Sequence, residues 1–298
     1  MSRKALLEEL RQRPLLCDGA MGTQLIVCGL PAGACAELWN VQNPDVVQSV
    51  HRQYRSAGCD LITTNTFGGT SSSLGKHHLA QRAAELNIAG SKLAREAAGE
   101  EAWVLGDIGP FGGFLEPVGD TQPEEALHFF IDQAQALVQG GADALVVETM
   151  SDPAELALAV RGAKRATGRP VIATYAFARG DGGFRTMMGT DVKTALHAAI
   201  DAGADVVGAN CGTSLSLPDY VELAEQLIKV AGKTPVIVQP NAGSPRTVGG
   251  NLVYAATAQD LAAIVPQLLG LGVGIIGGCC GTTPDHLRAM AQALRGDL

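Results

Sequence analysis

One pattern recurs eight times along the 298 residues: a short apolar run, rich in β-branched residues, is followed by a longer segment with helical periodicity. We predict strands at 15–17, 61–64, 104–106, 144–148, 171–175, 206–209, 236–239 and 274–277. We predict helices at 43–57, 79–98, 123–139, 153–166, 191–202, 217–231, 258–270 and 284–295. Strands that alternate with helices form a parallel sheet covered by helices. Eight repeats predict an α/β fold of the closed (β/α)₈ type, the TIM barrel, and an open doubly wound sheet is the alternative.

The repeats run without a break. No linker, low-complexity segment or block of charge divides the chain, so residues 1–298 are expected to form a single domain. The segments 58–60, 141–143 and 203–205 read Gly-Cys-Asp or Gly-Ala-Asp and precede strands two, four and six, where a helix must end and the chain must turn. The apolar stretch 261–280 contains one proline and several glycines, which predict a helix end, a turn and a buried strand rather than a membrane span.

Charge and cysteine usage narrow the class of protein. The chain has 22 basic and 30 acidic side chains and a formal net charge of −8, which argues against nucleic acid as its main partner. Met1–Leu10 predicts a charged amphipathic turn of helix without the apolar core of a signal peptide, so a cytoplasmic location is expected. The seven cysteines are too few and too irregularly spaced for a disulfide framework, and are expected to be thiols, ligands or nucleophiles.

Three of these cysteines follow predicted strands at the end of the barrel where chemistry is expected. Cys211 follows strand six, and Cys279 and Cys280 follow strand eight. These strands flank strand seven, so the three thiols can converge, and Asn241 after strand seven could add a neutral oxygen. Three thiolates suit Zn²⁺ and leave a fourth position for an exchangeable group. No histidine competes, because all six lie in predicted helices or on their flanks.

Other arrangements of the cysteines remain open. Each thiol could be a buried packing residue, and Cys279 and Cys280 could form a strained vicinal disulfide. The glycines on both sides of that pair favour the metal site, because they are expected to clear space around the sulfurs. Cys28 and Cys35 form a rival pair in the first loop, but they lack a zinc-knuckle spacing.

Two carboxylates are predicted at the same rim. Asp18 follows strand one and Glu148 ends strand four, and their negative charge is costly beside thiolates unless cations balance it. Zinc would be one such cation and a substrate ammonium another; the alternative is a salt bridge to lysine or arginine that closes the barrel end. The turn at 18–23, which contains Gly19 and Ala20, can present backbone N–H groups to a carboxylate. An ammonium, a carboxylate and a thiol together describe a small thiol amino acid.

The strand ends carry motifs in a recognisable order. They are Asp-Gly-Ala-Met-Gly-Thr at 18–23, Thr-Asn-Thr-Phe at 64–67, Gly-Asp-Ile-Gly-Pro at 106–110, Glu-Thr at 148–149, Asn-Cys at 210–211, Gln-Pro-Asn-Ala-Gly at 239–243 and Gly-Gly-Cys-Cys-Gly-Thr-Thr-Pro at 277–284. This set resembles the homocysteine S-methyltransferase family over nearly the whole chain, and the last motif is the most specific. Within the family the sequence is most similar to the homocysteine-binding module of cobalamin-dependent methionine synthase.

The resemblance implies a zinc-dependent transfer of a methyl group to homocysteine, giving methionine. Cys211, Cys279 and Cys280 would hold zinc and act in catalysis, and the substrate thiolate would displace Asn241 from the fourth position. Zinc lowers the pKa of a bound thiol, so homocysteine would be a thiolate at neutral pH. The anionic sulfurs around the metal should keep it nucleophilic for an in-line transfer.

The resemblance also implies how the amino acid is held and which donor is used. Asp18 and Glu148 would meet the ammonium, and the turn at Gly19 and Ala20 the carboxylate. The Pro-Asn-Ala-Gly stretch at 240–243 resembles the cobalamin-dependent branch, so methylcobalamin is the expected donor. Because the chain has no Asp-x-His-x-x-Gly corrinoid signature, the methylcobalamin would arrive on a partner protein or domain. Thr149 stands where betaine-using relatives carry tyrosine. Direct use of S-methylmethionine or betaine remains an alternative, as does a non-catalytic zinc or redox thiol module.

Overall fold

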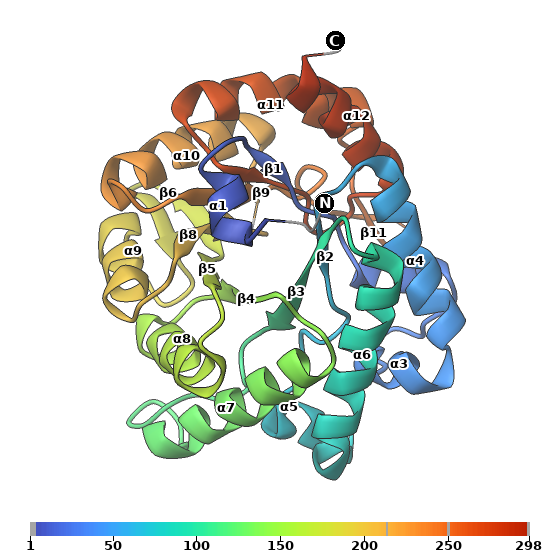
Figure 1. Cartoon of the computed structure of the whole chain (residues 1–298). Coiled ribbons are helices and arrows are strands. Elements are labelled where there is room, and N and C mark those ends of the chain that lie inside the picture. The colour runs from blue at the N-terminus through green and yellow to red at the C-terminus, as the bar shows by residue number, and fades with distance from the viewer. Residues whose placement is uncertain (1–3, 213, 249–250, 297–298) are drawn as a thin grey trace.

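Eight parallel strands form one sheet in the computed structural model, which describes residues 4–212, 214–248 and 251–296 (Figure 1). They are β1 (Leu15–Leu16), β2 (Leu61–Thr63), β3 (Trp103–Ile108), β4 (Ala144–Met150), β5 (Val171–Tyr175), β8 (Val206–Asn210), β9 (Val236–Gln239) and β12 (Ile275–Ile276). Their order is β1-β12-β9-β8-β5-β4-β3-β2. A bridge between Cys17 and Leu61 and a hydrogen bond from Asp60 N–H to Leu16 O (2.8 Å) join the two ends. The sheet is therefore closed, and the predicted barrel is confirmed.

The eight predicted helices surround the sheet in the predicted order (Figure 1). They are α4 (Pro44–Ala57), α6 (Ala83–Ala98), α7 (Pro123–Gln139), α8 (Pro153–Thr167), α9 (Val192–Asp201), α10 (Leu217–Ala231), α11 (Ala258–Leu271) and α12 (Pro284–Arg295). Hydroxyl caps accept from the third-residue amide at Ser216, Thr257 and Thr283, which begin the last three of them. Shorter helical pieces complete the set: α1 (Leu6–Leu10), α2 (Gly22–Val27), η1 (Ala36–Leu38), α3 (Trp39–Gln42), α5 (Ser71–Gly75) and η2 (Ala80–Arg82).

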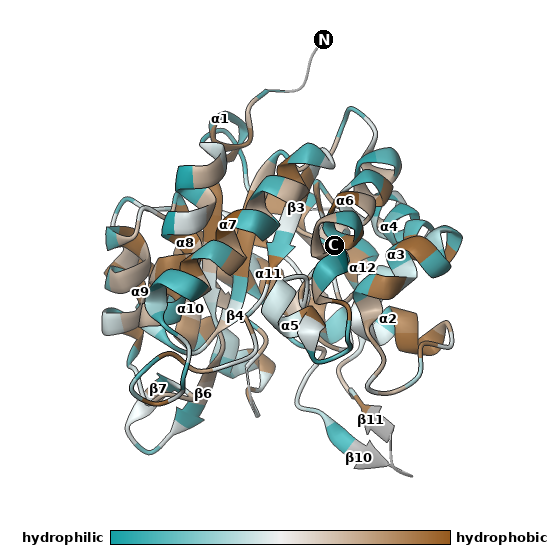
Figure 2. Cartoon of the chain, turned by 90° about the horizontal axis from the view of Figure 1, so that it is seen from below, coloured by the Kyte–Doolittle hydropathy of each residue, from teal (hydrophilic) through white to brown (hydrophobic). Residues whose placement is uncertain are grey.

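Two antiparallel hairpins were not expected from the sequence. β6 (Phe177–Gly180) and β7 (Gly183–Thr186) lie between β5 and α9, and β10 (Arg246–Val248) and β11 (Asn251–Val253) lie between β9 and α11. In Figure 2 both hairpins project from one end of the barrel, and α1 lies at the other end. Because each hairpin pairs only with itself, its strands need no continuous apolar run, and the pattern that identifies the barrel strands is missing from them.

The barrel interior is filled by alternate side chains of the strands. This inner cluster consists of Leu15, Cys17, Leu61, Trp103, Leu105, Ala144, Val146, Ile172, Val206, Ile237 and Ile275, and Leu6 of α1 packs against it. Because strand side chains alternate in direction, the next inward positions are Asp107, two residues after Leu105, and Glu148, two residues after Val146. The inner cluster is therefore the apolar floor of the barrel, and carboxylates follow it toward the hairpin end.

At the segments 58–60, 141–143 and 203–205 a helix ends and the chain turns into the next barrel strand, as predicted. Their glycines have left-handed φ values of 104°, 110° and 100° at positions 58, 141 and 203. Each aspartate accepts a hydrogen bond from a backbone N–H of the strand before its own and pairs with a basic side chain. The contacts are Asp60 with Leu16 N–H (2.9 Å) and Arg13 (2.9 Å), Asp143 with Val104 N–H (2.8 Å) and Arg95 (2.8 Å), and Asp205 with Val171 N–H (2.8 Å) and Lys164 (2.8 Å).

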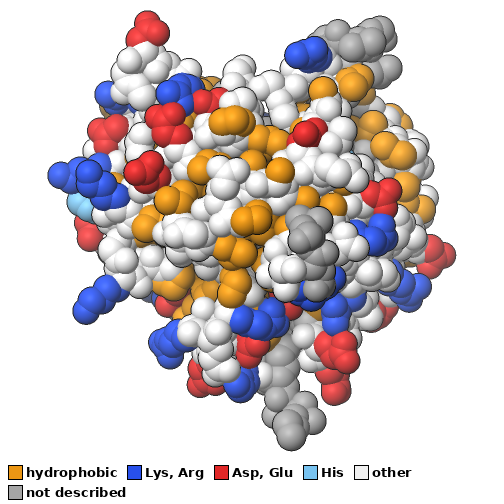
Figure 3. All heavy atoms as spheres, turned by 90° about the horizontal axis from the view of Figure 1, so that it is seen from above, with side chains coloured by type: hydrophobic (Ala, Val, Ile, Leu, Met, Phe, Trp, Pro, Cys, Tyr) orange, Lys and Arg blue, Asp and Glu red, His pale blue; other side chains and the backbone are white. Residues whose placement is uncertain are grey.

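The apolar stretch 261–280 also resolves as predicted. Helix α11 ends at Leu271, Gly272 follows with a left-handed φ of 94°, and β12 comes next. Figure 3 shows one side of the molecule with hydrophobic side chains across its middle and many of its charged side chains toward its edges. Among the described residues, no helix is both long enough and apolar enough to span a bilayer.

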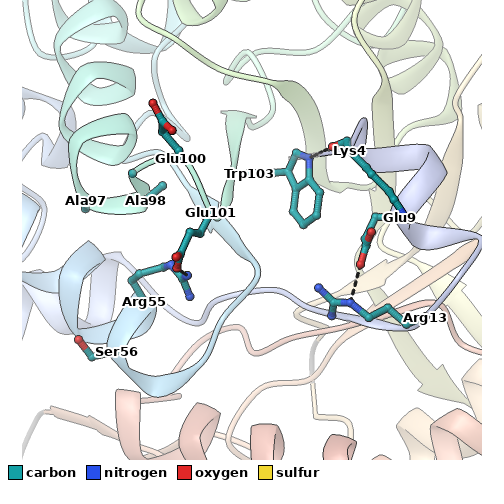
Figure 4. Close-up of a pocket in the computed structure, with 11 residues that line it drawn as sticks. Lys4, Glu9, Arg13, Arg55, Ser56, Ala97, Ala98, Glu100, Glu101 and Trp103 are labelled. Atoms are coloured by element: carbon teal, nitrogen blue, oxygen red, sulfur yellow. Dashed lines mark hydrogen bonds and ion pairs between the residues drawn. The ribbon is translucent and has the colours of Figure 1, made fainter. Parts of the chain in front are cut away.

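A cavity of about 920 Å³ opens at the end of the barrel covered by α1. It is lined by residues that precede strands, and four of its charged side chains form two ion pairs: Arg13 with Glu9 (2.7 Å) and Arg55 with Glu101 (2.8 Å) (Figure 4). The indole N–H of Trp103 donates to the carbonyl of Lys4 (3.2 Å). This cavity lies at the N-terminal ends of the strands, away from the predicted site. Residues at that end of a (β/α)₈ barrel usually contribute to stability, whereas active sites lie at the C-terminal ends of the strands.

Candidate metal centre and substrate site

The three cysteines predicted to bind a metal lie together. Their sulfur atoms are all within 4.8 Å of one another, and the Sγ atoms of Cys211 and Cys280 are 3.8 Å apart. They converge because β8 and β12 lie on either side of β9 in the sheet. All seven cysteines are free thiols. Cys28 is exposed and Cys35 is buried with its Sγ donating to Glu37, so the rival pair in the first loop does not form this cluster.

The segment 239–242 fixes the backbone of all three cysteines. Its contacts are Cys211 N–H to Gln239 O (3.2 Å), Cys279 N–H to Pro240 O (2.8 Å) and Ala242 N–H to Cys280 O (2.9 Å). Cys211 has a left-handed φ of 53°, which is uncommon for a residue with a side chain. The Tyr220 hydroxyl donates to the carbonyl of Cys211 and accepts from the amide of Asn241 (3.2 Å). The ligand set therefore belongs to one hydrogen-bonded unit.

The flanking glycines serve a different purpose from the one predicted. A Cβ on Gly278 would lie 2.5 Å from Oγ1 of Thr282, and one on Gly281 would lie 2.1 Å from Cγ of Tyr254. The glycines thus make room for these two side chains rather than for the sulfurs. Thr282 is fully buried and donates to Cys279 O (2.7 Å), so the close packing holds the cysteine loop in place.

Asn241 has the environment expected of a metal ligand. Its Nδ2 donates to Gly212 O (3.1 Å), while its Oδ1 is buried and has no hydrogen-bond partner among the described residues. The Asn241 side chain also contacts the Cys211 thiol. Buried amide oxygens are nearly always paired, so the unpaired Oδ1 of a residue at the cysteine cluster calls for a ligand. Three sulfurs and one oxygen are a donor set that tetrahedral zinc accepts. The residues present fit the predicted metal.

The three thiols of the cluster differ in pKa, because they share hydrogen bonds. Hydrogen bonds from Cys279 and Cys280 lower the pKa of the Cys211 thiol well below its ordinary value. The same contacts, together with burial, raise the pKa of Cys279. One sulfur is therefore ionised easily and the others less so, and a bound cation would favour the thiolate form of all three.

Asp18 and Glu148 lie in the barrel mouth without a cationic partner. Asp18 is 2% exposed, and its carboxylate accepts from the amide (2.8 Å) and hydroxyl (2.7 Å) of Thr63. Burial raises the pKa of Asp18 to about 7. Burial, followed by the charges of Cys211 and Asp18, raises the pKa of Glu148 to about 8. Within the described ranges, neither carboxylate forms an ion pair with lysine or arginine, so the salt bridge considered as an alternative is not found.

The turn after β1 is tied to the cysteine loop. A Cβ on Gly19 would lie 2.4 Å from Thr282 Oγ1, and the Ala20 amide donates to that same oxygen (3.1 Å). The Tyr54 hydroxyl donates to the Ala20 carbonyl (2.8 Å). The predicted contact of this turn with a substrate carboxylate remains a prediction, and the Ala20 N–H is already engaged within the protein.

Asn210 is a positioning residue, because its side chain holds Thr149, the residue after Glu148. In the sequence it is visible only as part of the Asn-Cys motif at 210–211. Its Oδ1 accepts from Thr149 N–H (2.8 Å) and Thr174 Oγ1 (2.7 Å), and its Nδ2 donates to Thr149 Oγ1 (2.7 Å). Thr149 has a left-handed φ of 60°, and the register of β4 shifts between Val147 and Met150. Glu148 therefore lies inside an irregular strand rather than at its end. The one sign of this role in the sequence is that Asn210 directly precedes Cys211, a predicted metal ligand.

Asp107 is a third carboxylate in the mouth. It is 5% exposed, its amide donates to Thr64 Oγ1 (2.9 Å), and its carbonyl accepts from Thr66 Oγ1 (2.8 Å). Its carboxylate Oδ1 is buried without a hydrogen-bond partner among the described residues. Burial and then the charges of Glu148, Glu37 and Asp18 raise the pKa of Asp107 well above its ordinary value. The position of Asp107 at the end of a strand is predictable from the sequence, but its unpaired oxygen is not.

Comparison with known proteins agrees with these observations. The family model described as homocysteine S-methyltransferase matches residues 15–294. The methionine synthases of Mycobacterium leprae and Mycobacterium tuberculosis are 36% and 35% identical to this chain, over 97% of it. In each case the match covers 25% of the relative, so the chain spans about a quarter of their length.

Solved structures match over the full length. The metallated form of the homocysteine methyltransferase MmuM from Escherichia coli superposes with a TM-score of 0.76 at 25% identity, covering 96% of this chain and 98% of MmuM. Its oxidised form gives 0.74 at 26% identity, over 96% and 97% of the two chains. A methyltransferase from Methanosarcina mazei, 13% identical over 98% of this chain and 97% of its own, shares the fold with a TM-score of 0.61.

Proposed function

Since this chain belongs to the homocysteine S-methyltransferase family, we propose that it methylates homocysteine to methionine with the help of zinc. Residues 1–298 would act as the homocysteine-binding barrel domain. The observation that carries the proposal is the cluster of Cys211, Cys279 and Cys280 at the mouth, together with Asn241, whose side chain contacts Cys211 and whose oxygen is unpaired among the described residues. Membership of the family supports a methyltransferase, and the cluster supports the metal.

Cys211, Cys279 and Cys280 would hold the zinc, with Asn241 as a fourth ligand that the substrate can replace. When bound, zinc would act as a Lewis acid that lowers the pKa of the substrate thiol, so that homocysteine reacts as a thiolate. The protein supplies the rest of the catalysis by orientation. The hydrogen bonds from segment 239–242 and Tyr220 fix the cysteines, and the closed barrel below them excludes water.

The carboxylates would select an amino acid. Asp18 and Glu148 lie in a mouth with no paired cation among the described residues, and they would meet the substrate ammonium. The turn that contains Gly19 and Ala20 would face the substrate carboxylate, using amides other than that of Ala20. A charge-assisted hydrogen bond of this kind contributes about 1.5–3 kcal/mol.

The methyl donor would come from outside the chain. Similarity to one quarter of two methionine synthases favours methylcobalamin carried on a partner protein or another domain. The match to the homocysteine methyltransferase MmuM over 98% of its length supports a second candidate, a direct transfer from a small donor such as S-methylmethionine without a corrinoid. Betaine is the least favoured, because Thr149 follows Glu148 and aromatic residues are only 4% of the chain. We place the reaction in the cytoplasm, where free thiols persist.

One experiment separates these donors. Zinc-loaded protein is incubated with homocysteine and, in parallel, with methylcobalamin, S-methylmethionine or betaine, and methionine is measured over time. We expect methionine with methylcobalamin. Turnover with S-methylmethionine alone would establish the second candidate. Absence of methionine with every donor, in protein shown to contain zinc, would contradict the proposed function.

A further inference from the structure

The mouth of the barrel holds one carboxylate more than the proposed function uses. Asp107 lies on β3, between β2 and β4 in the sheet, and faces inward one step above the apolar floor. Its backbone is fully engaged, because the amide donates to Thr64 and the carbonyl accepts from Thr66 and from Gln133 Nε2 (3.1 Å). The main chain at Asp107 is thereby fixed at the mouth, and the carboxylate Oδ1 has no partner among the described residues.

An unpartnered carboxylate at this depth is costly to the fold. Burial of a charged or polar group without a hydrogen bond costs several kcal/mol in order of magnitude, and hydrophobic residues of similar size avoid that cost. The neighbouring inward positions on β3, Trp103 and Leu105, are apolar and fill the floor. A packing role would therefore be served better by an apolar residue, and the orphaned oxygen indicates a ligand that enters the mouth.

The arrangement of charges favours an ammonium group over a second metal. Among the described residues, the cysteine cluster is the one place where three potential ligand atoms lie within 4.8 Å of one another, so the carboxylates of Asp18, Asp107 and Glu148 are spread more widely. Their charges still act on one another. An ammonium has three N–H donors that point in different directions, and its acceptors lie about 2.8 Å from the nitrogen, farther away than the oxygen ligands of a small metal ion. It therefore suits carboxylates that do not close around a metal.

Resting on the proposed function, we propose that Asp107 accepts the third N–H of the homocysteine ammonium and is a specificity-determining residue for amino-acid thiols. Asp18 has part of its capacity taken by the amide and hydroxyl of Thr63. The Oδ1 of Asp107 has no partner among the described residues, so its contact with the ammonium is strong and charge-assisted. The zinc ligands lie on β8, β9 and β12, across the mouth from β3, so this contact fixes the far end of the substrate while its sulfur points to the metal site.

The test compares homocysteine with 4-mercaptobutanoate, which is homocysteine without its amino group. Affinities are measured by calorimetry on zinc-loaded wild type, Asp107→Asn and Glu155→Gln. Glu155 is a matched control, a buried carboxyl on α8 whose Oε1 already accepts from the Phe111 amide (2.8 Å). We expect Asp107→Asn to weaken homocysteine binding roughly ten- to hundredfold and to leave 4-mercaptobutanoate within about twofold. Glu155→Gln should change neither.

The outcomes separate this inference from the function on which it rests. Wild type that fails to bind homocysteine would contradict the proposed function. Wild type that prefers homocysteine, with the same preference retained in Asp107→Asn, would overturn the role of Asp107 alone. Equal losses for both thiols would overturn it as well, because they indicate damage to the metal site. Zinc content and melting temperature are measured for each variant, and Asp107→Ser replaces Asp107→Asn if the latter does not fold.

Discussion

At the scale of single residues, the mouth of the barrel concentrates acidic groups that the folded chain does not pair. Asp18 is the clearest case, because it is buried and its pKa lies near 7 instead of near the ordinary value of an aspartate. The backbone and hydroxyl of Thr63 stabilise its ionised form only partly against burial. Such a residue lowers the stability of the protein until a cation arrives, which is a common cost of a functional site.

This cost predicts how stability depends on pH. The folded-state pKa of Asp18, about 7, exceeds the unfolded value, so the unfolded chain releases this proton at lower pH than the folded protein does. The contribution to stability is complete below the unfolded pKa and is lost as pH rises through about 7. Asp18→Asn should therefore reduce the fall in unfolding free energy between pH 5 and pH 8 by roughly 1–4 kcal/mol. Denaturant titrations of substrate-free protein at both pH values measure it, and parallel pH profiles of variant and wild type would disprove it.

Some residues of the candidate site could be predicted from the sequence and others could not. Cys211, Cys279 and Cys280 could be assigned together because strand order alone brings their positions side by side. Asn210 and Asp107 could not be assigned from the sequence. Asn210 matters because its side chain forms particular hydrogen bonds, and Asp107 matters because its Oδ1 has none among the described residues. A strand-end position says that a side chain is at the rim, but it does not say whether that side chain finds a partner.

At the scale of elements, three of the eight repeats are stabilised by the aspartate that precedes their strand, Asp60, Asp143 and Asp205. Asp205 shows how: it accepts from Val171 N–H (2.8 Å) at the start of β5 and pairs with Lys164 of α8 (2.8 Å). The same residue thus joins two strands and one helix. The sequence predicts the turn at these positions from the glycine and the aspartate, but the cross-strand hydrogen bond depends on the register of the neighbouring strand and is visible only in the structure.

Removal of this link should weaken the barrel without affecting the site. Asp205→Ala leaves the Val171 amide without its acceptor and Lys164 without its partner, so we expect a loss of about 1–3 kcal/mol in unfolding free energy. Asp205→Asn keeps one acceptor oxygen and should lose less. Both variants should retain zinc and homocysteine affinity, since Asp205 lies at the opposite end of β8 from Cys211. Loss of zinc at unchanged stability would show that the link acts on the site instead.

The loops after the strands are the elements that the repeat does not predict. The hairpins β6–β7 and β10–β11 both lie at the mouth end, where a barrel can change its loops without changing its core (Figure 2). Helix α5 and the 3₁₀ turns are also in this class, since they are too short to show a helical period. Fold and loop structure therefore differ in predictability for a physical reason: burial imposes a pattern on the strands and imposes less on the loops.

At the scale of the whole molecule, the barrel separates stability from chemistry along its axis. The end covered by α1 holds paired charges around the cavity in Figure 4, and the opposite end holds the sulfurs and the unpaired carboxylates. An apolar floor lies between them. From this division we expect changes at the mouth to alter ligand binding while the chain remains folded. The net charge of −8 is compatible with a cationic ligand.

The central claim is that three cysteine sulfurs hold zinc and that homocysteine supplies a fourth. X-ray absorption at the zinc edge counts the sulfur neighbours of the metal directly, in zinc-loaded protein alone, with homocysteine, and with homoserine, its oxygen analogue, as the control. The account predicts three sulfurs at about 2.3 Å and one oxygen or nitrogen in the protein alone and with homoserine, and four sulfurs with homocysteine. A shell with fewer than three sulfurs, or one that saturating homocysteine leaves unchanged, would contradict it.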